Sequence, residues 1–151
     1  IVSVHLWFDR PVIADEFLGL PGRTMQWVFD KRTAAGSTGG AVSLVSSGVA
    51  EALARTNEDL IALALDELAG ALPAVRSARL VNATVVREPR ATFSLAPGQP
   101  PRPSAETAVP GFYLAGDWTD TGLPATIEGA VRSGFAAADL ITRSSHHQTT
   151  R

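Results

Sequence analysis

The sequence predicts a mixed α/β (α+β) fold in two parts, an antiparallel sheet with a covering helix over residues 1–95 and a strand–turn–helix unit over residues 96–143. Three observations predict this fold. Short runs of β-branched and aromatic residues recur in the first part, and an amphipathic helical pattern follows them. Further on, a wholly apolar run leads through an irregular turn into a helix rich in small residues.

Composition excludes several classes of function. The net charge of -2 lacks the basic excess that nucleic-acid binding requires. The absence of cysteine excludes disulfides, thiolate catalysis and cysteine-type zinc sites. We expect no metal site at all, because no second ligand stands at metal-binding spacing from His5. No apolar stretch reaches the roughly 20 residues of a spanning helix, and we expect a cytoplasmic protein.

Alternating residues predict the first strand over residues 1–8, which the Asp-Arg-Pro sequence at 9–11 ends. One face of this strand carries Val2, Val4, Leu6 and Phe8. Residues 23–30, 41–45 and 78–87 predict further strands. Because the first three strands are closely spaced, we expect an antiparallel sheet.

A helix is predicted over residues 57–72, with Asn57 as its cap and Pro73 as its stop. Its apolar residues recur at helical spacing and comprise Leu60, Ile61, Ala64, Leu65, Leu68 and Leu72. This amphipathic pattern indicates a helix that covers the sheet.

The second part begins with residues 96–110, in which five prolines predict an irregular excursion. Residues 111–115 then predict a strand buried on both faces, as in a parallel sheet. A helix follows from Pro124 to about Arg143, and residues 144–151 should form a flexible tail. We expect the buried stripe of that helix to consist of Ile127, Ala130, Val131, Gly134, Phe135, Ala138 and Ile141.

The turn between this strand and this helix is the candidate binding site. Ligands bind beyond the carboxyl ends of strands in open α/β sheets, where a helix N-terminus offers unpaired N–H groups. Gly116 allows close approach of the backbone, Asp117 can accept hydrogen bonds from sugar hydroxyls, and Pro124 suits a first helical turn. A strand–turn–helix connection without a ligand fits this pattern equally well.

The string FYLAGDWTDTGLPATIEGAVRSGFAAADLI resembles the C-terminal FAD motif of the flavin amine oxidase and phytoene desaturase superfamily. Together with VHLWFDRPV and EPRATFSLAPGQPPRPSAET, it also resembles the hydroxysqualene dehydroxylases, or squalene-associated FAD-dependent desaturases. The resemblance implies the C-terminal part of an FAD/NAD(P)-binding, Rossmann-like flavoprotein with an antiparallel substrate-domain sheet. Residues 1–95 would belong to the substrate domain and residues 96–143 to the FAD domain.

The resemblance also implies the residues that bind FAD. Asp117 matches the acidic residue near the ribityl chain, and Ile127 matches the position whose backbone N–H faces the flavin ring. The predicted FAD-binding residues are Gly116, Asp117, Trp118, Pro124, Ala125, Thr126 and Ile127. Glu128 matches an orienting carboxylate of the helix start, and no catalytic residue is assigned.

The implied substrate is a hydrophobic isoprenoid. Flavin amine oxidases usually carry a Lys near the strand that matches residues 1–8 and a Tyr at the position of Thr126, and this sequence has neither. Candidate residues to line an apolar substrate tunnel are Trp7, Phe8, Trp27 and Phe29, although ordinary core aromatics fit the same pattern. His5 is expected to be a hydrogen-bonded residue of the wall.

The expected activity is reductive dehydroxylation of hydroxysqualene to squalene. The alternatives are a phytoene or carotenoid desaturase, a flavin amine oxidase, and an inactive fragment that binds no FAD alone. No G-x-G-x-x-G unit with a flanking strand and helix occurs in the 151 residues. We therefore expect a fragment whose N-terminal Rossmann portion lies elsewhere, and a parent protein in peripheral contact with membranes.

Overall fold

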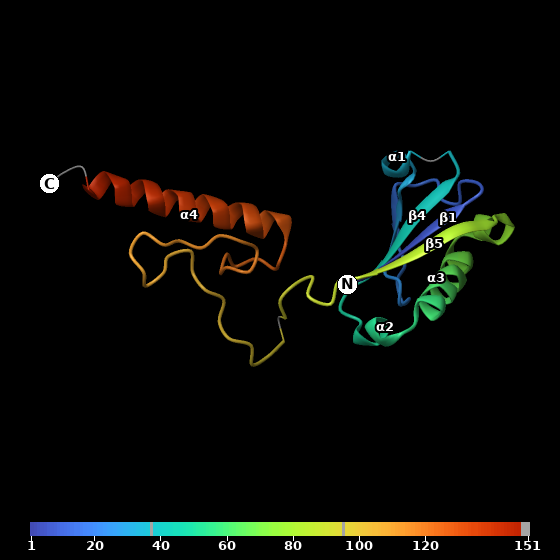
Figure 1. The fold of residues 1–151 in the computed structure, drawn as a ribbon, viewed down its shortest axis with the longest axis horizontal. Coiled ribbons are helices and arrows are strands. Elements are labelled where there is room, and N and C mark those ends of the chain that lie inside the picture. The colour runs from blue at the N-terminus through green and yellow to red at the C-terminus, as the bar shows by residue number, and fades with distance from the viewer. Residues whose placement is uncertain (37, 95, 149–151) are drawn as a thin grey trace. The chain divides into compact units, whose positions relative to one another are not determined.

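The structure is a computed structural model that describes residues 1–36, 38–94 and 96–148. It contains two compact units, residues 1–91 and residues 92–151 (Figure 1).

An antiparallel sheet of five strands forms the N-terminal unit, in the order β2-β3-β4-β1-β5. The strands are β1 (Val2–Phe8), β2 (Phe17–Gly19), β3 (Trp27–Asp30), β4 (Gly40–Ser46) and β5 (Leu80–Arg87). The predicted antiparallel sheet is confirmed. The sequence pattern does not predict β2, because three residues are too few to show alternation.

The core lies between one face of this sheet and helix α3 (Asn57–Ala71), which runs along the sheet (Figure 1). The predicted alternation of β1 is confirmed, since Val2, Val4, Leu6 and Phe8 are all buried. From α3, Leu60, Ala64 and Leu68 pack into the same core and are fully buried. Each large side chain that is buried in this way stabilises the fold by about 1.5–3 kcal/mol.

The cap of α3 differs from the prediction. Thr56, not Asn57, is the N-cap, and its Oγ1 accepts the N–H of Asp59 at 3.1 Å. Thr and Asn are both good caps, and here Thr56 has the extended backbone that a cap requires. The short helices of this unit are α1 (Arg32–Ala35), α2 (Ala50–Ala54) and the 3₁₀ helix η1 (Pro73–Ser77).

Glu67 joins α3 to the segment before β3. Its two carboxylate oxygens accept the N–H groups of Thr24 and Met25, each at 2.8 Å. Its carbonyl accepts a hydrogen bond from Arg23 Nη1 at 2.7 Å. Because these two N–H groups bind a carboxylate instead of a neighbouring strand, the strand predicted over residues 23–30 is shortened to Trp27–Asp30.

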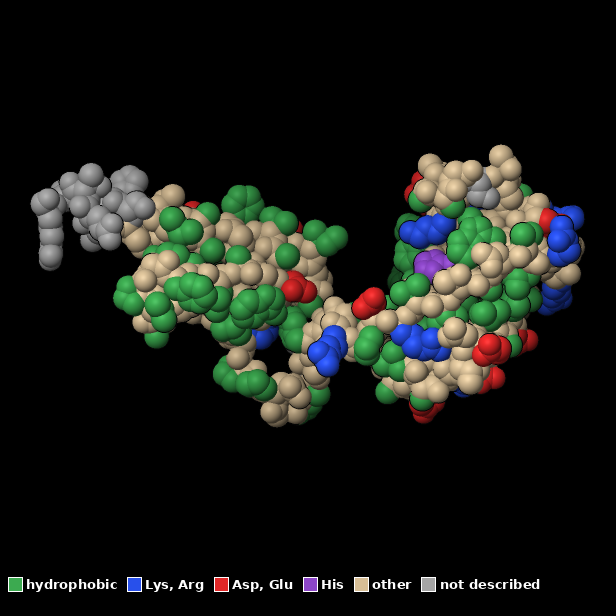
Figure 2. Space-filling model, in the orientation of Figure 1, with side chains coloured by type: hydrophobic (Ala, Val, Ile, Leu, Met, Phe, Trp, Pro, Cys, Tyr) green, Lys and Arg blue, Asp and Glu red, His purple; other side chains and the backbone are tan. Residues whose placement is uncertain are grey.

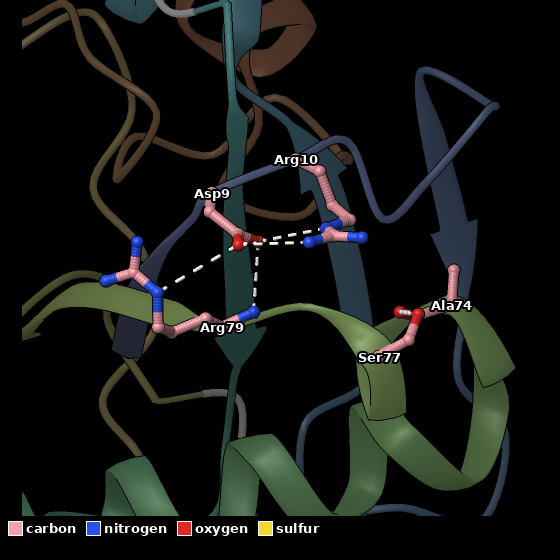
Figure 3. Close-up of polar contacts among 5 residues, drawn as sticks. All are labelled: Asp9, Arg10, Ala74, Ser77 and Arg79. Atoms are coloured by element: carbon pink, nitrogen blue, oxygen red, sulfur yellow. Dashed lines mark hydrogen bonds and ion pairs between the residues drawn. The ribbon is translucent and has the colours of Figure 1, made fainter.

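Asp9 fixes the point where β1 ends beside the start of β5 (Figure 3). Its Oδ1 accepts the N–H of Arg79 at 3.0 Å, and its own N–H donates to the Arg79 carbonyl at 3.0 Å. Arg10 donates to both carboxylate oxygens at 3.1 and 3.2 Å. The hydrogen bonds from Arg10 and then from Arg79 hold the pKa of Asp9 below its usual value, so the carboxylate stays ionised.

The C-terminal unit consists of irregular chain and one long helix, α4 (Ile127–Gln148). The strand predicted over residues 111–115 is not formed, and Tyr113 makes only an isolated antiparallel bridge with Glu106. A buried strand needs strands on both sides, and no other strand occurs among the described residues of this unit. Helix α4 continues past Arg143 to Gln148, and the last residues of the predicted tail, 149–151, lie outside the described residues.

The predicted buried stripe of α4 is largely wrong. Ile127, Val131 and Phe135 are exposed, and Figure 2 shows hydrophobic side chains gathered on the surface of this helix. The buried positions are small residues instead, namely Gly129, Ser133 and Ala137. Small side chains let the preceding loop approach the helix closely, while the described residues of this unit include no sheet against which the large ones could pack. Across the described residues, no helix has the length and apolarity needed to cross a membrane.

We predict that Glu67→Ala lowers the free energy of unfolding by about 2–4 kcal/mol, because two N–H groups lose a charged acceptor. Glu67→Gln should have a smaller effect, since its single oxygen still accepts one bond. Urea denaturation followed by tryptophan fluorescence measures both values. Asp66→Ala, at an exposed neighbour on α3, is the control and should change stability by less than about 0.5 kcal/mol. Equal effects of Glu67→Ala and Asp66→Ala would contradict the anchoring role.

Candidate functional site

Gly116 is fixed against the second turn of α4. Its N–H donates to Ser133 Oγ at 2.7 Å, and that hydroxyl donates to the Ala130 carbonyl at 2.7 Å. The Gly116 carbonyl accepts both the N–H and the hydroxyl of Thr119, at 3.1 and 2.8 Å. Ser133 and Thr119 are each 1% exposed, so these bonds hold the start of the turn in a water-excluded environment.

The conformation at residue 116 requires glycine. Its φ is 152°, and a Cβ at this position would overlap the indole ring of Trp118. The indole ring of Trp118, in the same turn, therefore packs against the backbone of Gly116. Trp118 itself remains 43% exposed, so one part of its ring is available for further contacts.

Thr126 is the N-cap of α4. Its Oγ1 accepts the N–H of Gly129 at 3.0 Å, and its carbonyl accepts the N–H of Ala130 at 3.0 Å. The helix thus begins at Ile127. The sequence pattern predicts Pro124 in the first helical turn, and this prediction is wrong, because Pro124 lies before the helix. The hydroxyl of Thr126, a favoured cap, determines this start more strongly than the fixed φ of proline.

The first turn of α4 offers two backbone donors. Within the described part of the chain, the N–H groups of Ile127 and Glu128 make no hydrogen bond, as is usual for first-turn groups. The chain before the helix packs closely against its first turn, because a Cβ on Gly129 would lie 2.9 Å from the Pro124 carbonyl oxygen. Two free donors at the positive end of a long helix can bind an electron-rich group.

Asp117 and Glu128, two of the carboxylates in or beside this turn, differ in their surroundings. Asp117 is half-buried, and its carboxylate accepts no hydrogen bond from any described residue. Glu128 forms an exposed ion pair with Arg132, in which Nε and Oε1 are 2.7 Å apart. The free acceptor of the site is therefore Asp117, whereas Glu128 is engaged on the helix surface.

Arg102 is a site residue that the sequence pattern does not predict. Its guanidinium donates to the carbonyls of Asp117, Trp118 and Leu123, all in the turn before α4. The sequence signal is weak: an arginine between two prolines, in a segment that carries part of the family resemblance but whose residue pattern indicates only irregular chain. The structure thus brings the seven predicted FAD-binding residues and Arg102 together in one unit.

The predicted substrate-lining residues lie in the other unit, on the face of the sheet opposite α3. Trp27 and Phe29 alternate along β3, with ring centroids 6.4 Å apart, and Phe17 of β2 lies 6.1 and 6.2 Å from them. Trp7 lies on the corresponding face of β1. Phe8 does not line this face, because the alternation of β1 turns it into the core, where it is 4% exposed.

His5 occupies the same face as Trp7, with ring centroids 6.3 Å apart. Burial, and then the charge of Lys31, lower its pKa, so the imidazole is neutral near pH 7. Among the described residues it has no hydrogen-bond partner, contrary to the predicted hydrogen-bonded role. No three His, Cys, Asp or Glu side chains in the described ranges lie close enough together to hold a metal ion.

We predict that Thr126→Ala speeds hydrogen exchange at the Gly129 amide, because the cap that binds this N–H is lost. Loss of a cap costs about 1 kcal/mol, which corresponds to a roughly fivefold faster exchange. Thr126→Ser keeps the hydroxyl and should exchange like the parent. Hydrogen exchange measured by NMR distinguishes them, and equal protection in Thr126→Ala and Thr126→Ser would show that Thr126 is not the cap.

Comparison with known proteins adds to this geometry. Residues 1–142 match the family described as flavin containing amine oxidoreductase. The chain is 38% identical over 143 residues to the hydroxysqualene dehydroxylase of Sinorhizobium fredii and 39% identical over 144 residues to that of Rhodopseudomonas palustris. Both alignments cover 93% of this chain and 32% of the relative.

A second group of relatives is plant proteins. The chain is 30% identical over 163 residues to the 15-cis-phytoene desaturase, chloroplastic/chromoplastic, of Glycine max, an alignment that covers 100% of this chain and 29% of that protein. The chain therefore spans about a third of the length of the relatives it matches. The predicted resemblance, the cofactor FAD and the oxidoreductase class are confirmed for the family, and this chain belongs to the flavin-containing amine oxidoreductases.

Proposed function

We propose that this chain supplies the isoalloxazine and ribityl side of an FAD site in an oxidoreductase that reductively dehydroxylates hydroxysqualene. The observation that supports the FAD site is the pair of free N–H groups at Ile127 and Glu128, together with the free carboxylate of Asp117 in the turn that leads to this helix. The substrate class is supported by the similarity to two proteins named hydroxysqualene dehydroxylase.

The residues present fit the flavin half of FAD. Asp117 would accept a hydrogen bond from a ribityl hydroxyl, and the two N–H groups would stabilise negative charge on the ring edge. Gly116, Trp118, Pro124, Ala125 and Thr126 would shape the surrounding contact surface. Bound FAD would supply hydride transfer, while this chain's own groups bind and orient it.

The remaining half of the FAD site is proposed to lie outside the 151 residues. Ile127, Val131 and Phe135 of α4 are 87%, 49% and 69% exposed, which is unusual for three large apolar residues on one helix. The relatives are about three times as long as this chain. We infer that, in the whole protein, sequence that corresponds to their additional length covers this face.

The open face of the antiparallel sheet would form an apolar wall for the substrate. Phe17, Trp27 and Phe29 make a continuous aromatic surface there, and Trp7 extends the apolar face on β1. Such a surface suits a hydrocarbon chain. A squalene-type substrate partitions into lipid, so we also propose peripheral contact of the whole protein with membranes.

The second candidate is a phytoene-type desaturase, in which hydride would leave the isoprenoid. The similarity to the desaturase of Glycine max over the whole chain favours it. Amine oxidation is a weaker candidate, since residues 1–8 contain no Lys and Thr126 stands where a Tyr is usual. A non-enzyme alternative is that the 151-residue chain alone binds no FAD. If FAD added to the purified chain keeps the fluorescence of the free cofactor, this alternative holds.

Reoxidation of the reduced flavin tests the substrate class. We predict that the full-length protein, reduced anaerobically, is reoxidised by hydroxysqualene and not by phytoene, because only hydroxysqualene has a leaving hydroxyl. Flavin absorbance measures reoxidation, and product analysis should find squalene. Reduced protein without substrate is the control, and its flavin must stay reduced, which shows that residual oxygen does not reoxidise it. Reduction of the oxidised flavin by phytoene, with no reoxidation of the reduced flavin by hydroxysqualene, would refute the proposed reaction.

Flavin retention tests the role of Asp117. Asp117→Ala should weaken FAD binding roughly tenfold to a hundredfold, because one hydrogen bond to a charged acceptor is lost. The FAD content of the purified full-length protein and titration of its apo form measure the effect. Asp139→Ala, which removes an exposed carboxylate from α4, is the matched control and should bind FAD normally. Unchanged flavin content in Asp117→Ala would contradict the assignment.

A further inference from the structure

Arg102 donates to three backbone carbonyls of one turn. Nη2 donates to the Asp117 carbonyl at 2.6 Å, Nε donates to the Trp118 carbonyl at 3.3 Å, and Nη1 donates to the Leu123 carbonyl. Asp117 and Leu123 mark the two ends of the turn before α4. A single guanidinium therefore holds both ends of residues 117–123 together.

Neighbouring residues also hold the segment that carries Arg102 in place. Arg102 stands between Pro101 and Pro103, whose rings restrict the backbone. The Pro103 carbonyl accepts the N–H of Asp120 at 2.8 Å, which adds a bond in the opposite direction. The guanidinium also lies over the ring of Phe93, 4.8 Å from its centroid, in a cation–π contact.

These contacts do not constitute an ion pair. Among the described residues Arg102 forms no salt bridge, and all three of its protein acceptors are neutral carbonyls. Irregular chain has no helix or strand to satisfy its carbonyls, so a donor from elsewhere must do so. Arg102 supplies that donor for three peptide groups at once.

A lysine could not replace this arrangement. A guanidinium is planar and presents five donors in a rigid fork, whereas an ammonium group concentrates its donors on one nitrogen. The three carbonyls bind three different nitrogens of Arg102. Arg102→Lys therefore keeps the charge but loses the geometry.

We propose that Arg102 is a positioning residue of the FAD site. By fixing residues 117–123, its guanidinium orients the Asp117 carboxylate relative to the first turn of α4, so that both can contact the flavin half of the cofactor. This inference rests on the proposed FAD site. It deepens that proposal, because Arg102, which lies outside residues 117–123, would determine the conformation of this turn.

A cavity beside Arg102 allows chemical rescue. It has a volume of about 460 Å³, and its lining includes Phe93, Pro101, Arg102 and Trp118. Truncation in Arg102→Ala would enlarge this cavity and leave three carbonyls without their donor. Free guanidinium ion has the planar donor geometry to occupy that position, whereas methylammonium has the charge without the fork.

The experiment measures the Kd of FAD for apo forms of the full-length protein, together with the thermal midpoint of each apo form. Arg102→Lys should raise the Kd of FAD roughly tenfold, because a displaced Asp117 carboxylate loses about one hydrogen bond to the cofactor. It should lower the apo thermal midpoint by no more than about 2 °C, since the lysine keeps one donor for the turn. In Arg102→Ala, guanidinium should restore FAD binding and the visible spectrum of the bound flavin, and methylammonium should not. Arg143→Lys, at an exposed position of α4, is the control and should bind FAD like the parent.

The outcomes separate this inference from the proposed function. A parent protein that binds no FAD would overturn both. A parent that binds FAD while Arg102→Lys binds it equally well would overturn the role of Arg102 alone. A loss of binding matched by a lower apo thermal midpoint and not rescued by guanidinium would show a general structural role, which also overturns the inference.

Discussion

The peptide groups of residues 116–123 lie in neither helix nor strand, so their N–H and C=O groups need partners from elsewhere in the chain. Ser133 binds the N–H of Gly116, and Arg102 binds three carbonyls further along. At the far end, Thr126 caps the helix that follows. The proposed cofactor site depends on these internal hydrogen bonds, because only the polar groups that they leave unbonded are available to bind FAD.

A different constraint organises the antiparallel sheet. Strict alternation in β1 places one set of side chains against α3 and turns His5 and Trp7 to the other face. Glu67 then fixes the segment before β3 to α3 through two backbone N–H groups. The covered face supplies stability, and the opposite face keeps its aromatic side chains partly exposed, as the proposed wall for an apolar substrate would require.

Helix α4 combines two kinds of surface on one cylinder. Gly129, Ser133 and Ala137 are buried, and a Cβ on Gly129 would come within 2.9 Å of a backbone oxygen. The larger Ile127 and Phe135 remain exposed. The small residues thus determine where the turn lies on the helix, while the large ones mark the surface that is proposed to meet further sequence of the protein.

The sequence by itself determined the elements whose patterns are local: the buried face of β1, the buried face of α3, and the place of the turn before α4. It also identified the family, because the motif there is continuous in the chain. Only the tertiary structure decided the role of Arg102, which binds carbonyls 15 to 21 residues away, and that of Glu67, whose backbone partners are 42 and 43 residues away. It likewise showed residues 111–115 without strand structure. Hydrogen bonds of this kind leave no periodic pattern, since a side chain can satisfy any backbone group that the fold brings within reach.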